Sequence, residues 1–365
     1  MPAEISTPSP LLYAPANLPA RIYLLADDLT GACDAGAAFL AAGREVRVWL
    51  GAKAPFAAPE SVQAVNTASR DLPADQAAEA VTRAASDLKA AADAIVFKKV
   101  DSAARGHIAA ELLAAQRALG AQATLFAPGF PAMGRTVRDG ILEVRDASGQ
   151  NVRIDLRELF AAEMSDSTAL IAHATELTAA LDAGRTIVIC DSATQEDLNA
   201  LANAAKSIAT LLYAGSAGLA RALAHTYGSH ASAPLPAAAR TLLIAGTPHP
   251  LTKLQLEQLE SSPRLAERVQ ILRTDCEPGN EATIREIFHA FNPEALILTG
   301  GDTALFAGQA LGAHSILLKG EFTAGIPWGI LQGGEAQGRI VVTKSGGFGL
   351  PSALHDLIER FAGEA

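Results

Sequence analysis

The feature that most constrains the fold is the regular alternation of short, largely apolar runs with alanine-rich segments of helical length. RIYLLA (21–26), AIVFKKV (94–100) and TIVIC (186–190) are such runs. Short apolar runs suit strands that are buried on both faces, and the segments between them are long enough to be crossover helices. We therefore predict an α/β protein whose mostly parallel sheets are covered by helices on both faces.

The alternation continues to the C-terminus and is interrupted once. Two alternating runs in 141–155 flank Ala147-Ser148-Gly149-Gln150 and predict a hairpin. Strands are expected at 21–26, 44–50, 62–66, 94–100, 123–128, 186–190, 210–214, 241–246, 268–274, 294–301, 314–320 and 338–349. Helices are expected at 31–42, 74–91, 106–119, 194–206, 250–261 and 281–291, after 303, and from about Ser216 and Ser352.

Two segments divide the chain. Residues 1–20 are rich in proline and are expected to be a flexible leader, and 228–240 is small, polar and proline-bearing between two apolar elements. Such composition is typical of linkers. We predict two α/β domains, 21–235 and 236–365, joined near residue 235.

Composition excludes several classes of protein. The chain has 49% hydrophobic residues, a net charge of −10 and no Lys/Arg-rich run, so we expect no nucleic-acid partner. Its three scattered cysteines argue against a disulfide framework or a structural zinc site. No signal peptide and no run of about 18 apolar residues is evident, so we expect a cytoplasmic protein without a membrane partner.

The first candidate cluster follows the first strand, at LLADDLTGACDAG (24–36). Asp27 and Asp28 come directly after the apolar run, and Thr30 opens the next helix. Ligands of open α/β sheets bind beyond the carboxyl ends of the strands, where two adjacent carboxylates would contact a cation or ligand hydroxyls. In the alternative interpretation, one aspartate caps the helix and the other faces water.

Cationic side chains follow three further strands. FKKVDSAARGHIAAEL (97–112) places charged groups at a strand-to-helix turn, NTASRDL (66–72) is another strand end, and APGFPAMGRTVRDG (127–140) is a Gly/Pro loop. Helix N-termini and guanidinium groups favour anions, although a solvated charged turn would have the same composition. The candidates are Lys98, Lys99, Asp101, Ser102, Arg105, Ser69, Arg70 and Arg135.

The C-terminal half has glycine turns after three strands. They are Gly246-Thr247, Thr299-Gly300-Gly301-Asp302-Thr303 and Lys344-Ser345-Gly346-Gly347-Phe348-Gly349. Glycine turns at helix N-termini fit a nucleotide polyphosphate, although purely structural turns remain an alternative. Neither G-x-x-x-x-G-K-[ST] nor an intact G-x-G-x-x-G after a strand occurs, which disfavours a Walker-A protein and a dinucleotide dehydrogenase.

In this order the clusters resemble the four-carbon acid sugar kinase family. The matching stretches are ADDLTGA (26–32), KKVDSxxRG (98–106), APGFPAMGRT (127–136), TGGDT (299–303) and KSGGFG (344–349). The resemblance implies an N-terminal sugar-acid domain, a C-terminal ATP domain and an active-site cleft between them. It places substrate at Asp27, Asp28, Ser69, Arg70, Asp101, Ser102 and Arg105, and ATP at Thr247, Gly300, Gly301, Asp302, Thr303, Gly346 and Gly347.

The resulting hypothesis is ATP-dependent phosphorylation of a hydroxyl of a threonate-, erythronate- or 3-oxo-tetronate-type acid. Asp28 would accept the proton, Asp27 would bind substrate hydroxyls or exchange roles with it, and Arg70 and Arg105 would clamp the carboxylate. Thr30, Lys99 and Arg135 complete the predicted substrate site, and Mg²⁺ would bridge the ATP oxygens with few protein ligands. The alternatives are a dehydrogenase or phosphatase of a similar acid, and a non-catalytic sensor. The stereoisomer, the phosphorylated hydroxyl and a possible homo-oligomeric state stay open.

Overall fold

The computed structural model describes residues 21–51, 61–88, 94–146, 149–161, 167–208, 210–228, 233–277 and 280–363. The predicted leader, part of the predicted linker and the first two turn residues of the predicted hairpin lie outside these ranges. Within them, no helix combines the length and the apolar character needed to cross a membrane.

Most strands belong to one sheet of fourteen strands, in the order β13-β12-β14-β17-β16-β15-β2-β3-β1-β4-β11-β5-β10-β9. Its strands in the N-terminal half are β1 (Arg21–Ala26), β2 (Glu45–Trp49), β3 (Ser61–Asn66), β4 (Ala94–Lys99), β5 (Ala123–Ala127), β9 (Thr168–Ile171), β10 (Ile187–Cys190) and β11 (Leu211–Gly215). Those in the C-terminal half are β12 (Thr241–Ala245), β13 (Val269–Arg273), β14 (Ala295–Thr299), β15 (Ser315–Thr323), β16 (Ile326–Gln332) and β17 (Ile340–Lys344).

The helices lie between the strands in sequence, as crossover connections require. In the N-terminal half they are α1 (Leu29–Ala38), α2 (Ala74–Leu88), α3 (Ile108–Leu119), α4 (Leu177–Asp182), α5 (Gln195–Ala205) and α6 (Ala217–His225). In the C-terminal half they are α7 (Pro250–Glu260), α8 (Pro263–Ala266), α9 (Asn280–Phe291), α10 (Gly301–Ala310) and α11 (Ala353–Phe361).

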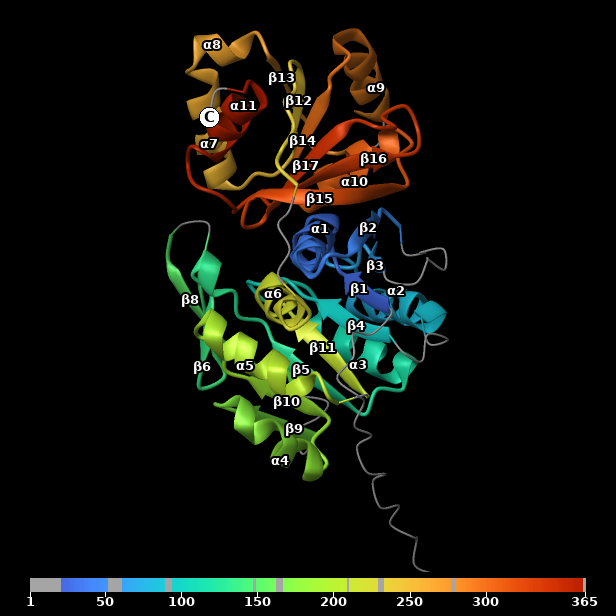
Figure 1. The fold of residues 1–365 in the computed structure, drawn as a ribbon, viewed down its shortest axis with the longest axis vertical. Coiled ribbons are helices and arrows are strands. Elements are labelled where there is room, and N and C mark those ends of the chain that lie inside the picture. The colour runs from blue at the N-terminus through green and yellow to red at the C-terminus, as the bar shows by residue number, and fades with distance from the viewer. Residues whose placement is uncertain are drawn as a thin grey trace, which may run out of the picture.

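The predicted α/β class with mostly parallel sheets is confirmed. All neighbouring strands from β2 to β9 run parallel, as do β13, β12, β14 and β17, whereas β16 and β15 pair antiparallel with their neighbours. The two halves stack one above the other (Figure 1).

The sheets of the two halves are joined edge to edge, which the sequence did not predict. β15 pairs antiparallel with β2, with Ser315 opposite Trp49 and Leu318 opposite Val46. The apolar pattern of each segment predicts a strand. Which strands pair at the edges of two sheets, when the segments lie so far apart in sequence, depends on how the halves pack.

A separate three-stranded antiparallel sheet confirms the predicted hairpin. Its strands are β6 (Thr136–Arg138), β7 (Ile141–Arg145) and β8 (Asn151–Asp155), in the order β6-β7-β8. The elements β6, β9, β16, α4 and α8 were not predicted. In β16, Pro327 and Gly329 interrupt the apolar pattern, and both residues disfavour strands in isolation.

Helix α1 lies at the junction of the halves and positions the candidate site. All ten of its residues are buried, because it packs against β1, β3 and α6 on one side and β15 and α10 on the other. Small residues permit this close packing, and a Cβ added to Gly36 would lie 3.2 Å from both Val46 and Leu318. The residues just before α1 are therefore held next to the C-terminal half.

Candidate active site

Of the two paired acids, Asp28 faces the glycine turns of the C-terminal half across a cavity of about 330 Å³. Asp28, Arg70 and Arg105 line it from one side, and the turns that follow β12, β14 and β17 line it from the other. The predicted residues Thr247, Gly300, Gly301, Asp302, Thr303 and Gly346 are all among its lining residues. Clusters predicted from separate segments of sequence thus meet in space.

Asp28 is the N-cap of α1, as its position after a buried strand and before a helix favours. Its carboxylate accepts hydrogen bonds from the backbone N–H of Gly31 at 2.9 Å and the Thr30 hydroxyl at 2.5 Å. Burial raises the pKa of Asp28, but Arg70, Lys99 and the Thr30 hydrogen bond outweigh it, so the pKa lies below its ordinary value. Asp28 is therefore ionised and oriented toward the cavity.

Arg70 is held by three carboxylates. It donates from Nε and Nη2 to both oxygens of Asp27, at 2.8 and 3.0 Å, and from Nη2 to Asp28 at 2.7 Å. Asp101 Oδ2 lies 3.7 Å from the same Nη2. Since its charge is already balanced inside the protein, Arg70 orients the acids, and little of its charge is left for a substrate carboxylate.

Arg105 forms a bidentate pair with Asp101, donating at 3.0 and 2.7 Å. The Asp101 carboxylate also accepts the backbone N–H of Ala103 at 2.9 Å. Burial raises the pKa of Asp101, but Arg105 and Arg70 lower it by more than burial raises it. The pKa therefore lies well below its ordinary value, and this carboxylate is ionised at all ordinary pH values. The Arg105 side chain is 61% exposed, and it reaches the large cavity from the rim.

Lys99 and Arg135 differ from these arginines because neither forms an ion pair within the described ranges. Lys99 is buried, donates to the carbonyl of Val100 at 2.8 Å and lines a small chamber beside Asp28. Arg135 donates to the hydroxyl of Ser102, which lines the same chamber, and burial lowers the pKa of Arg135. Since neither cation is paired with a carboxylate, both are candidates to bind an anion.

Ser69 and Lys98 lie deeper than the other predicted residues. Lys98 and the Ser69 hydroxyl both bind the buried carboxylate of Glu111, at 2.7 and 2.6 Å. Thr67 and Ser69 also share a hydrogen bond at 2.8 Å. This network fixes the turn after β3 that carries Arg70. Ser69 therefore positions Arg70 and does not itself line the chamber or the large cavity.

The glycine turns require residues without a side chain. Gly300 has a φ of 100°, a backbone conformation that other residues rarely adopt. A Cβ added to Gly246 would overlap the Thr303 hydroxyl, and one added to Gly346 would overlap the Thr247 hydroxyl. Gly347 lies beside His249, the N-cap of α7. The turns therefore form a compact concave surface around the N-terminus of α10.

Lys344 organises the turn that follows β17. Its fully buried ammonium donates to the carbonyl oxygens of Ser345 at 3.1 Å, Gly346 at 3.4 Å and Phe348 at 3.2 Å, and to the Thr252 hydroxyl at 3.2 Å. Burial lowers the pKa of Lys344 to about 7. Its role in the described structure is to hold the backbone of this turn.

Some lining residues were not among those predicted. Asp71, Asp275, Cys276 and Ser345 line the large cavity, and Asp34, Gly325 and Phe348 line the chamber. Asp275 and Cys276 follow β13, so the rule of strand ends that found Asp28 would also have found them. Gly325 lies in the turn between antiparallel strands, where that rule gives no signal.

Three of the five non-glycine residues with positive φ in the described ranges lie in or beside the candidate site. Ala68, Ala104 and Cys276 have φ values of 48°, 56° and 60°, although they are not glycine. Ala68 and Cys276 line cavities beside Asp28, and Ala104 lies in the turn between Asp101 and Arg105. Each such residue costs about 1–3 kcal/mol and tends to occur at functional sites.

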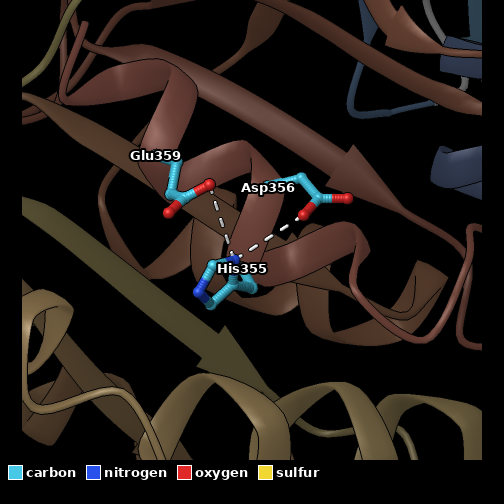
Figure 2. A group of neighbouring side chains, drawn as sticks. All are labelled: His355, Asp356 and Glu359. Atoms are coloured by element: carbon cyan, nitrogen blue, oxygen red, sulfur yellow. Dashed lines mark ion pairs between the residues drawn. The ribbon is translucent and has the colours of Figure 1, made fainter. Parts of the chain in front are cut away.

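One group of potential metal ligands occurs in the described ranges, away from this site. His355, Asp356 and Glu359 lie together on α11 (Figure 2). The histidine Nδ1 is 3.6 Å from Asp356 and 3.8 Å from Glu359, and Ser352 donates to Asp356 at 2.7 Å. Ion pairs along one helix account for this arrangement, and we assign no metal to it.

Comparisons with known proteins identify two domain models in the chain. Residues 22–223 match the model of a sugar-binding N-terminal domain, and residues 280–354 match that of a nucleotide-binding C-terminal domain. The chain is 30% identical to a D-threonate kinase of Bordetella bronchiseptica, over 91% of this chain and 95% of the relative. It is 28% identical to a D-threonate kinase of Salmonella typhimurium, over 93% and 97% of the two chains.

Solved structures share the fold. A Salmonella typhimurium protein superimposes with a TM-score of 0.72 at 20% identity, over 94% of this chain and 100% of that one. A Haemophilus influenzae protein does so with a TM-score of 0.65 at 21% identity, over 93% and 100%. With both domain models matched in order and relatives aligned over nearly the whole length, this chain belongs to the four-carbon acid sugar kinase family.

Proposed function

We propose that this protein is an ATP-dependent kinase that phosphorylates a hydroxyl of a four-carbon sugar acid, with D-threonate as the first candidate substrate. The observation that carries the proposal is the approach of the α10 N-terminus to the Asp28 carboxylate across a cavity lined by both halves. Relatives named D-threonate kinase support the choice of acid. We accordingly assign 21–235 to the sugar acid and 236–365 to the nucleotide.

The phosphate groups of ATP would bind at the glycine turns. The free N–H groups and dipole at the start of α10 favour an anion, and the turn after β14 has no side chain at Gly300 or Gly301 to exclude one. Thr247 and Gly346 face this point from the neighbouring turns. The arrangement fits a polyphosphate better than it fits the extended dinucleotide of a dehydrogenase.

Asp28 would accept the proton of the attacking hydroxyl. Its low pKa keeps it ionised, and its bonds to Thr30, Gly31 and Arg70 fix its orientation. Phosphoryl transfer passes through a loose transition state, in which positioning and charge matter more than a strong base. Asp27, with both oxygens bound by Arg70, would serve to orient that guanidinium.

The substrate carboxylate would bind Lys99 and Arg135. Both cations are free of ion pairs within the described ranges, and the Ser102 hydroxyl, which accepts from Arg135, lines the chamber together with Lys99. This assignment differs from the clamp expected from the sequence, because Arg70 and Arg105 already hold aspartates. The chamber holds about 20 Å³, room for about one water, so its walls must separate for an acid to enter.

The cavity also has the oxygen donors that Mg²⁺ prefers. Asp28, Asp71, Asp275 and Asp302 line it, and Asp275 and Asp302 belong to the glycine-turn side. Mg²⁺ bound with ATP would neutralise negative charge on the phosphate oxygens. Asp302 and Asp275 would hold it, with water completing its coordination.

The proposal is tested by measuring ADP formation from ATP and Mg²⁺ with a panel of tetronates. Acid-dependent ADP release and a phosphorylated product are expected. ATP hydrolysis without an acid should be much slower, because closure of the site around the acid excludes water from the phosphate. Reduction of NAD⁺ without ADP would favour a dehydrogenase. Tight binding of acid and nucleotide with no turnover would favour a sensor.

A further inference from the structure

We propose that Phe348 is the specificity-determining wall that limits the length of the sugar acid. The inference rests on the proposed kinase function and deepens it, because it assigns substrate selection to a residue of the nucleotide-binding half. Phe348 lies in the turn after β17 and lines the chamber that contains Lys99 and Ser102.

The chamber has one wall that cannot yield easily. Asp101 is fixed by the backbone of Ala103 and the guanidinium of Arg105, and Lys99 ends a central strand of the sheet. The opposite wall is formed by Gly325, Ser345 and Phe348 of the C-terminal half. An entering acid must therefore displace the C-terminal wall, and each added carbon requires a larger displacement.

The Phe348 ring is positioned by contacts on several sides. The Arg135 guanidinium lies 5.2 Å from its centroid, and the Phe130 ring meets it edge-on at 6.2 Å. A Cβ added to Gly325 would overlap the ring, so the glycine makes room for it. Because Arg135 is also a proposed carboxylate ligand, the ring stands beside the acid-binding end of the chamber.

The backbone of Phe348 is held as firmly as its ring. Lys344 donates to its carbonyl oxygen at 3.2 Å, and Gln255 donates to the same oxygen at 3.1 Å. The same turn carries Gly346, which lines the nucleotide cavity. The turn therefore joins the two subsites, and removing the ring enlarges the chamber without removing the groups that would hold phosphate.

The test compares kcat/KM for four-, five- and six-carbon aldonic acids in the unaltered chain and in Phe348→Ala. We expect the ratio of five-carbon to four-carbon kcat/KM to rise at least about tenfold in the variant, since one methylene in a shaped pocket changes discrimination by about that factor or more. The KM for ATP is measured in parallel and should change less than this ratio. Phe322→Ala is the matched control, because it removes a phenylalanine ring from β15 that does not line the chamber. It should leave the ratio unchanged.

Phe348→Leu keeps most of the apolar contact and provides a second variant, with folding of each monitored by thermal unfolding. A smaller rise in the same ratio is expected for it. An unchanged ratio in a folded Phe348 variant that still phosphorylates a tetronate overturns the inference and leaves the kinase function standing. Absence of turnover by the unaltered chain with every acid overturns both.

Discussion

Gly301, the first residue of α10, lies directly against the carboxylate of Asp28, the residue that caps α1. A Cβ added to Gly301 would overlap Asp28 Oδ2 and stand 3.1 Å from Asp28 Cγ. Gly301 lies in the stretch that matches a nucleotide-binding C-terminal domain, and Asp28 lies in the stretch that matches a sugar-binding N-terminal domain. Their approach brings a helix N-terminus, which favours phosphate, next to an ionised carboxylate that could take a proton.

Replacing Gly301 by alanine should impair turnover, because the added Cβ must displace the Asp28 carboxylate. We expect kcat/KM to fall at least about a hundredfold, as a displacement of about 1 Å at a reacting group can cost that factor. Gly51→Ala is the control, since a Cβ there would meet no atom of the described ranges within 4 Å. Steady-state kinetics of both variants check this, and full activity of Gly301→Ala would contradict the site geometry.

Asp28→Asn should lower kcat by about 10²–10⁴-fold while changing the dissociation constant for ATP by less than about threefold. Asparagine caps a helix as well as aspartate does, so the start of α1 should persist. Asp27→Asn provides the comparison, because Asp27 acts through Arg70 and its loss should reduce kcat less. Calorimetric ATP binding and single-turnover rates give the two quantities. A larger loss in Asp27→Asn would transfer the proton-accepting role to Asp27.

The pair Arg221–Glu321 should couple the halves. Arg221 on α6 donates to both oxygens of Glu321 on β15, at 2.8 and 2.7 Å, and both side chains are largely buried. In a double-mutant cycle with Arg221→Gln and Glu321→Gln, we expect a coupling free energy of about 1–3 kcal/mol in urea unfolding. The exposed pair Arg273–Glu260 should give no more than about 1 kcal/mol. Equal coupling in the two pairs would argue against an interface role for Arg221.

Asp34 should make stability depend on pH. Burial raises the pKa of Asp34 to about 6, and Arg221 at 3.5 Å offsets this only in part. The folded state therefore binds the Asp34 proton more tightly than the unfolded state, so this contribution to stability is present below about pH 4 and is lost as pH rises through about 6. Asparagine does not ionise.

As pH rises from 5 to 8, Asp34→Asn should accordingly become more stable relative to the unaltered chain by about 1.4 kcal/mol, because pH 5 lies about one unit below the folded-state pKa of Asp34. Urea unfolding at the two pH values measures the difference. If the stability of Asp34→Asn minus that of the unaltered chain stays constant or falls as pH rises, the folded state does not hold the Asp34 proton as the burial of Asp34 implies.

The local elements, and most of the residues that the structure brings together in the candidate site, could be predicted because their signals are local. An apolar run followed by acids or glycines marks the carboxyl end of a strand, and this rule placed Asp28 and Gly301 correctly beside a shared cavity. The pairing of β2 with β15 and the position of Gly325 depend on the packing of the two halves. Likewise, Arg70 and Arg105 could be identified from the sequence as candidate cations. Their ion pairs with Asp27 and Asp101 could not, because those pairs depend on the folded geometry of the turns.

The proposed active site is tested most directly by a crystal structure with a non-hydrolysable ATP analogue and D-threonate. We expect the γ-phosphate to lie at Gly300 and Gly301, with a threonate hydroxyl between it and Asp28. We also expect the threonate carboxylate to contact Lys99 and Arg135. Nucleotide bound away from the α10 N-terminus, or threonate bound with its hydroxyls beyond reach of both Asp28 and the γ-phosphate, would contradict the proposed site.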